Sequence, residues 1–142
     1  MLTPTEFLEN LDFEKFESIL TEHTIVNPDN WRQELIEGPS TYTYLAAVME
    51  TAKKELDANK AAVELASSIF KRERREKEGK ISESKLNSEV ALDTNYKLSQ
   101  QYMRQAEEKY GWMKSIVCGM RYRHEVLIQL SSAARKELEL YK

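Results

Sequence analysis

A heptad pattern of apolar residues between positions 45 and 70 constrains this chain more than any other feature. Spacings of four and three residues alternate along it, as in a helix that buries one stripe against a partner helix. Its positions are Leu45, Met49, Ala52, Leu56, the polar Asn59, Val63, Ala66 and Phe70. No glycine or proline lies between residues 40 and 78. We therefore predict one long helix over residues 40–78, which is roughly 55–60 Å long and needs a partner helix.

The C-terminal third of the chain supplies that partner. A second heptad begins at Tyr96 and continues to the end of a predicted helix over residues 94–140. Two long helices joined by a short link predict an antiparallel hairpin in an all-α fold. Further apolar residues widen the second stripe beyond what one partner helix covers, which predicts assembly into a homo-oligomer. The residues expected at that interface are Trp112, Met113, Ile116, Val117, Met120, Leu127 and Leu130. The alternative, which the sequence leaves open, is that residues 4–22 fold back as a third helix of a monomeric bundle.

Helix start and stop signals divide this single domain into four segments. Residues 1–39 form an acidic N-terminal segment, with an amphipathic helix over 4–22 that has a possible break near Asn10 and two helical turns over 31–37. Gly38-Pro39 is expected to end those turns, so that Ser40 or Thr41 caps the long helix of residues 40–78. Gly79 is expected to close that helix. A short linking helix over 82–92 follows, capped by Ser82, and Asp93 or Thr94 caps the last helix over 94–140.

Charge is distributed unevenly along the chain. The net charge is −3, but residues 1–41 hold nine acidic residues against Lys15 and Arg32. No apolar run approaches the ~18–20 residues that span a bilayer, and the N-terminus has acids where a signal peptide has lysines. The single cysteine, Cys118, forms no internal disulfide and lies in an apolar sequence, which predicts a packed thiol. We expect a soluble protein of the cytoplasm.

Signals for catalysis are weak. His23 and His124 are far apart in the sequence, and the lone Cys118 excludes a thiolate cluster. His124 falls on the second heptad, and we therefore expect it to be a hydrogen-bonded histidine of the core. We predict neither metal nor cofactor, and a binding protein rather than an enzyme.

A dense basic segment follows the first heptad directly. Six cations occur within ten positions, interspersed with three glutamates, and they are Lys71, Arg72, Arg74, Arg75, Lys77 and Lys80. One explanation is a solvent-exposed helix end, where cations interact favourably with the helix dipole and with glutamates four residues away. Six cations exceed what that role needs, and each arginine can donate two parallel hydrogen bonds to one phosphate. We predict contacts with nucleic-acid phosphates here, and a weaker candidate at Arg121, Tyr122 and Arg123.

The order of these parts resembles the UvsY-type recombination mediator proteins of tailed phages. The resemblance covers roughly residues 42–137: a long helix ending in Lys and Arg, a capped link, and a last helix containing YGWMKSIVCGMRYRHEVLIQLS. It implies a non-enzymatic oligomer that binds single-stranded DNA, remodels the single-strand binding protein and loads the phage recombinase in the host cytoplasm. It also implies DNA contacts within Lys71, Arg72 and Arg74, and assembly through the C-terminal helix. The N-terminal forty residues are longer and more acidic than the family pattern leads us to expect, and they are outside the resemblance.

Two hypotheses follow. The first is a recombination mediator that binds single-stranded DNA non-specifically. The second is a helical adaptor or structural protein that binds a protein partner through its amphipathic helices.

Overall fold

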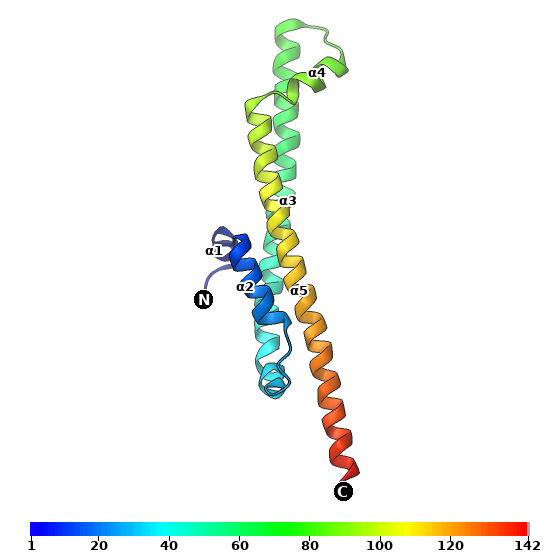
Figure 1. The fold of residues 1–142 in the computed structure, drawn as a ribbon. Coiled ribbons are helices and arrows are strands. Elements are labelled where there is room, and N and C mark those ends of the chain that lie inside the picture. Colours follow the sequence, from blue (N-terminus) through cyan, green and yellow to red (C-terminus); the bar gives the residue numbers. More distant parts are fainter. Residues whose placement is uncertain (142) are drawn as a thin grey trace. The chain divides into compact units, whose positions relative to one another are not determined.

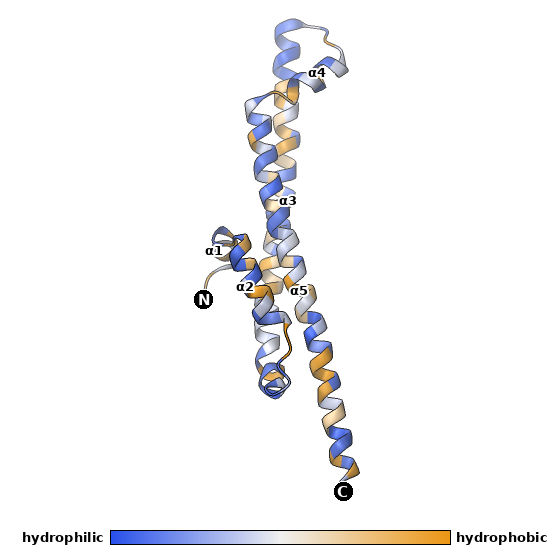
Figure 2. Cartoon of the chain, viewed as in Figure 1, coloured by the Kyte–Doolittle hydropathy of each residue, from blue (hydrophilic) through white to orange (hydrophobic). Residues whose placement is uncertain are grey.

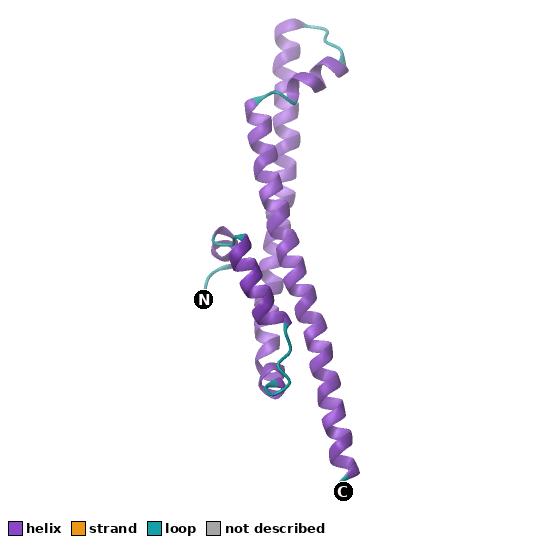
Figure 3. Ribbon diagram, in the orientation of Figure 1, coloured by secondary structure: helices purple, strands orange, loops and turns teal. Residues whose placement is uncertain are grey.

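The computed structural model describes residues 1–141, and this part of the chain is all-α, as predicted (Figures 1 and 3). No strand occurs among these residues. The helices in chain order are α1 (Pro4–Glu9), α2 (Phe13–Thr24), α3 (Trp31–Glu78), α4 (Glu83–Val90) and α5 (Thr94–Leu140).

Side-chain caps mark most of the helix N-termini in residues 1–141. The Oγ1 of Thr3 accepts a hydrogen bond from the Glu6 N–H, and Asp12, Ser82 and Asp93 accept equivalent bonds from N–H groups three residues on. Such caps satisfy N–H groups that the helix itself leaves unpaired. The break near Asn10 and the caps at Ser82 and Asp93 are therefore confirmed. The helix end at Gly79 is also confirmed, since this glycine has a φ of 75°, in the left-handed region.

The start of α3 differs from the prediction. The helix begins at Trp31 and continues through Gly38 and Pro39, so the expected N-cap at Ser40 or Thr41 is wrong. An interior proline removes one backbone hydrogen bond and costs about 3 kcal/mol. Tertiary packing outweighs this cost, because one face of the first turns is in phase with the later stripe and is half-buried: Trp31, Glu34, Leu35 and Gly38.

The fold divides into two compact units, and α3 and α5 each contribute to both. The first unit holds residues 1–51 and the chain from Gly111 onward. Helices α1 and α2 pack there against the first part of α3 and the later part of α5 (Figure 1). The buried apolar residues of this unit are Leu8, Leu11, Leu45, Val48, Met113, Ile116, Val117, Met120 and Leu127.

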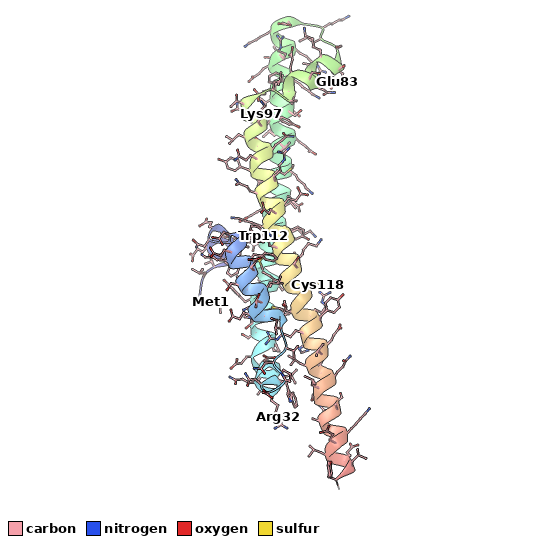
Figure 4. All side chains as sticks on the ribbon, viewed as in Figure 1. Met1, Arg32, Glu83, Lys97, Trp112 and Cys118 are labelled. Carbon is pink, nitrogen blue, oxygen red and sulfur yellow. The ribbon has the colours of Figure 1, made fainter. Side chains whose placement is uncertain are left out.

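Helix α2 covers the apolar stripe of α5 in this unit. Trp112, which Figure 4 labels, stacks on Phe16 with ring centroids 5.6 Å apart. The ring of Phe13 lies 6.2 Å from the same indole. About two turns further on, Gly119 of α5 lies against Thr24. This is the arrangement of the alternative prediction, in which the N-terminal segment folds back as a third layer.

Most residues of the predicted assembly interface take part in this packing within one chain, and assembly itself stays a prediction. Met113, Ile116, Val117, Met120 and Leu127 are all buried within one chain. Trp112 and Leu130 are half-buried. The stripe looked too wide for one partner helix because it meets two, α3 and α2, so its width does not by itself require further copies.

A largely enclosed ion pair holds α5 against the start of α3 in the same unit. Arg123 Nη2 lies 2.8 Å from Glu34 Oε1, and Arg123 Nη1 donates to the His23 carbonyl at 2.9 Å. The exposed fraction of both charged side chains is 14%. One arginine thus ties the end of α2, the start of α3 and α5 together.

Two predictions about single residues of α5 are wrong. His124 and Cys118 are exposed, whereas a core histidine and a packed thiol were expected. Cys118 lies among apolar neighbours in the sequence, but it follows Val117 by about 100° around the helix and so leaves the buried face. The burial of a residue here depends on which face of the helix it occupies and not on the polarity of its neighbours in the sequence.

The second unit holds residues 52–110 and contains a helical hairpin. The later part of α3 and the first part of α5 run antiparallel, and α4 with its two short loops joins them (Figure 1). The buried residues are Ala52, Leu56, Leu86, Val90 and Ala106. The remaining heptad positions of α3, from Asn59 to Phe70, are half-buried, which confirms the predicted stripe.

The two glycines of α5 test the packing of α2. In Gly119→Ala, the new Cβ would collide with Thr24 Cγ2, and it would lie 3.2 Å from Thr24 Cβ. In Gly111→Ala it would meet nothing within 4 Å. We expect Gly111→Ala to stabilise the protein by up to about 1 kcal/mol through helix propensity. We expect Gly119→Ala to be less stable than this control by about 1–3 kcal/mol because of overpacking.

Urea denaturation followed by circular dichroism measures both variants. Equal stability of the two alanine variants would contradict the contact between α2 and α5 at Gly119.

Candidate nucleic-acid interface

The basic segment, defined as residues 71–80, occupies the last turns of α3 and the loop after them. These turns and α4 are among the hydrophilic parts of the second unit (Figure 2). Sequence reasoning treated the six cations as equivalent. The structure separates them into three groups with different surroundings.

The first group is Lys71 and Arg75, which converge on one carboxylate. Lys71 Nζ donates to Glu83 Oε1 at 3.0 Å, and Arg75 Nη2 donates to Glu83 Oε2 at 2.6 Å. The hydrogen bond from Lys71, with the charge of Arg75 beside it, lowers the pKa of Glu83 below its ordinary value of 4.5. Glu83 is the first residue of α4, and Figure 4 labels it there. Each carboxylate oxygen therefore has its own cation.

The second group is Arg74, which has a structural environment. Its Nε and Nη2 donate to the two oxygens of Glu89 at 2.7 and 3.2 Å, in a bidentate pair, and Nη1 contacts Glu78. The exposed fraction of both the Arg74 and the Glu89 side chains is 25%. Hydrogen bonds from Arg74 lower the pKa of Glu89, and those to Glu89 and Glu78 raise the pKa of Arg74. With the buried Leu86 and Val90, this pair fixes α4 on α3.

The third group is Arg72, Lys77 and Lys80. All three side chains are exposed, and none forms an ion pair with another residue in the described range 1–141. Arg72 also lines an open hollow of about 420 Å³ together with Ser68, Lys71, Arg75 and Glu76. These cations are free to meet an external anion.

The second basic cluster is divided in a similar way. Arg123 is half-buried and is engaged by Glu34 and by the His23 carbonyl, so it holds the fold of the first unit. Arg121 and Tyr122 are exposed, and Arg121 Nη2 lies 3.4 Å from the Tyr42 hydroxyl. This cluster offers one cation to solvent where sequence reasoning saw two.

Sequence reasoning missed the carboxylates of α4. Glu83 and Glu89 lie between 8 and 15 residues along the chain from the cations that they contact. Rules for ion pairs within one helix consider only residues three or four positions apart, so they do not find these pairs. The only available signal was that a capped helix immediately after the basic segment presents acids at its first and seventh positions.

Metal-ligand clusters and membrane-spanning helices are not found in the part of the chain that the structure describes. Within residues 1–141, no three His, Cys, Asp or Glu side chains gather as metal ligands would. Over the same range, no helix combines the length and apolarity that crossing a membrane requires.

Comparisons with known proteins leave the chain without an assigned class. No protein-family model matches it, and neither the curated proteins nor the solved structures yield a match. The likeness to UvsY-type mediators therefore stays a prediction from the sequence.

Replacing Glu89 tests the anchor of α4. Because the folded-state pKa of Glu89 is depressed, its stabilising contribution is present above pH 4.5 and is lost as pH falls through the lower folded value. We expect Glu89→Gln to melt below the parent at neutral pH, with the difference shrinking below pH 4.5. Thermal melts at several pH values measure this.

Glu73→Gln is the matched control, because Glu73 is an exposed glutamate of α3 outside the ion pairs described above. A constant difference between Glu89→Gln and the parent at every pH would show that the carboxylate charge does not hold α4.

Proposed function

We propose that this chain binds single-stranded DNA without reading its sequence, as an oligomeric and non-enzymatic recombination mediator like those it resembles. The observation that carries the proposal is the exposure of Arg72, Lys77 and Lys80 beside Lys71 and Arg75, which already bind an oxyanion. An arrangement that holds a carboxylate with two charged donors is also suited to a phosphate.

The intrachain ion pairs weaken this site without closing it. Residues 71–90 hold seven cations and five carboxylates, so a small positive excess remains. Solvent-exposed ion pairs contribute little to stability and exchange readily for other partners. The side chain of Glu83 is 59% exposed. A DNA phosphate can therefore take its place, whereas the more enclosed Arg74–Glu89 pair supports the fold.

A modest charge excess makes one copy of the site a weak binder. Phosphate contacts are individually weak and strongly dependent on salt, and their sum over several linked sites can be large. Oligomerisation thus belongs to the proposal. The predicted interface is mostly buried, so the self-associating surface has to come from the exposed apolar residues of α5: Val126, Ile128, Leu138 and Leu140.

The proposed partners beyond DNA rest on the resemblance alone. They are a single-strand binding protein, which the mediator displaces or remodels, and a phage recombinase, which it loads. The proposed compartment is the cytoplasm of the host cell. This function needs neither a metal nor a cofactor.

A second candidate is a helical adaptor for a protein partner. The observation that favours it is a hollow of about 330 Å³ in the first unit, between α3 and α5. Met120, Leu127 and Pro39 give it apolar walls, and Tyr42 and His124 add polar groups. Such a combination is typical of a groove that takes an apolar side chain of a peptide.

The triple variant Arg72→Ala, Lys77→Ala, Lys80→Ala tests the DNA site. We expect at least about tenfold weaker binding to labelled oligothymidine, and a salt dependence whose slope falls by about two, because three phosphate contacts are lost. Fluorescence anisotropy at about 50 and about 200 mM salt measures both quantities.

The matched control is Lys53→Ala, Lys54→Ala, Lys60→Ala, which removes equal charge from exposed positions of α3. An equal loss in this control would assign binding to net charge alone. If the parent shows no salt-sensitive binding at micromolar concentration, the adaptor becomes the better explanation.

Replacing Leu138 and Leu140 by lysine tests self-association. Their exposed fractions are 63% and 84%, so the change costs little within one chain. We expect the double variant to have a smaller mass by light scattering than the parent and weaker DNA binding. The control is Gln129→Lys with Ser132→Lys, which adds equal charge at exposed polar positions of the same helix. A monomeric parent would overturn the proposed role of oligomerisation.

A further inference from the structure

Glu83 occupies the place in the basic segment where an anionic ligand would bind. Its two carboxylate oxygens accept from Lys71 Nζ at 3.0 Å and from Arg75 Nη2 at 2.6 Å. Lys71 and Arg75 are four residues apart, so they stand on one face of α3. Two oxygens of one phosphate can accept from the same two donors, because carboxylate and phosphate present paired acceptors to such cations in the same way.

We propose that Glu83 is an internal competitor for the phosphate site made by Lys71 and Arg75, and that it sets the affinity of this site for polyanions. The inference rests on the proposed function, since the ligand it concerns is the phosphate of a single strand.

Glu83 can leave the site without disturbing the fold. It is the first residue of α4, it follows the short loop after Gly79, and its side chain is 59% exposed. The rest of α4 is anchored independently, by the Arg74–Glu89 pair and by the buried Leu86 and Val90. A rotation of the Glu83 side chain is therefore enough to vacate the two cations.

Glu89 does not have this freedom. Its side chain is 25% exposed, and it receives two hydrogen bonds from one guanidinium. Displacing it would break a bidentate pair and loosen α4. The two acids of α4 consequently have different roles, Glu89 as an anchor and Glu83 as a replaceable ligand.

The pairing with Glu83 has two opposite effects on an incoming phosphate. It holds Lys71 and Arg75 in convergent positions despite their like charges, so the donors are already placed when the ligand arrives. It also obliges the ligand to displace a carboxylate, which lowers the affinity. Ser68 and Arg72 line the hollow beside these cations, and they can add further donors to the bound phosphate.

Glu83→Gln tests the competition directly. The amide is similar in size, but it has no charge to hold the two cations. We expect binding to labelled oligothymidine to become about three- to tenfold tighter than in the parent, with a steeper dependence on salt. The control is Glu73→Gln, which makes the same change of charge at an exposed position of α3 outside the ion pairs.

The outcomes separate the inference from the function on which it rests. An equal gain in Glu83→Gln and Glu73→Gln would reduce the effect to net charge and overturn the inference. A loss of affinity in Glu83→Gln would show that Glu83 only positions the cations, which also overturns it. Absence of oligothymidine binding by the parent would overturn the proposed function instead.

In that last case, calorimetry with tripolyphosphate decides the inference. Tighter binding by Glu83→Gln than by Glu73→Gln supports internal competition at an anion site, and equal binding overturns it. Melting curves of each variant, expected to match the parent, show that α4 has stayed in place.

Discussion

Packing between long amphipathic helices is the constraint on which both units depend. Helix α5 buries Met113, Ile116 and Val117 in the first unit, and its stripe is covered there by α2 as well as by α3. In the second unit the stripes of α3 and α5 face each other, with Leu56 and Ala106 buried. Most of the stability of a helix in a protein comes from packing of its amphipathic face, so the burial of these stripes holds α3 and α5 together, while caps mark where most of the helices begin.

Heptad spacing and capping residues made most of the helices and their boundaries predictable from the sequence. The stripe from Leu45 to Phe70, the break near Asn10 and the caps at Ser82 and Asp93 all follow from local rules. Local rules failed at Pro39, where contacts made by Trp31 and Glu34 carry the helix through a residue that ordinarily ends one. Local rules also misjudged the wide apolar stripe of α5. Periodicity shows which face of a helix is buried, but it does not show which other segment packs against that face.

The sequence predicts the cations of the candidate site but not the carboxylates that pair with them. A count of charges along the sequence locates the basic segment, but the carboxylates that meet it come from a different helix after a loop. Glu83 and Glu89 turn six apparently equal cations into an anchor at Arg74, a paired oxyanion site at Lys71 and Arg75, and three free charges. Tertiary pairing of this kind depends on where α4 packs, and Leu86 and Val90 determine that.

A partly neutralised site has a definite consequence for the proposed function. The exposed Arg72, Lys77 and Lys80 can attract a polyanion directly. At Lys71 and Arg75 a phosphate first has to displace Glu83, so the free energy gained there is only the difference between two similar contacts. Because phosphate contacts weaken as the salt concentration rises, we expect one such site to bind a strand weakly at physiological salt. Repeated along one strand, the same small gain becomes appreciable while each contact stays easy to exchange. Reversible binding of this kind is what a protein needs if it is to hand a strand on to another, so the weakness expected of the single site and the proposed assembly of several copies belong to one mechanism.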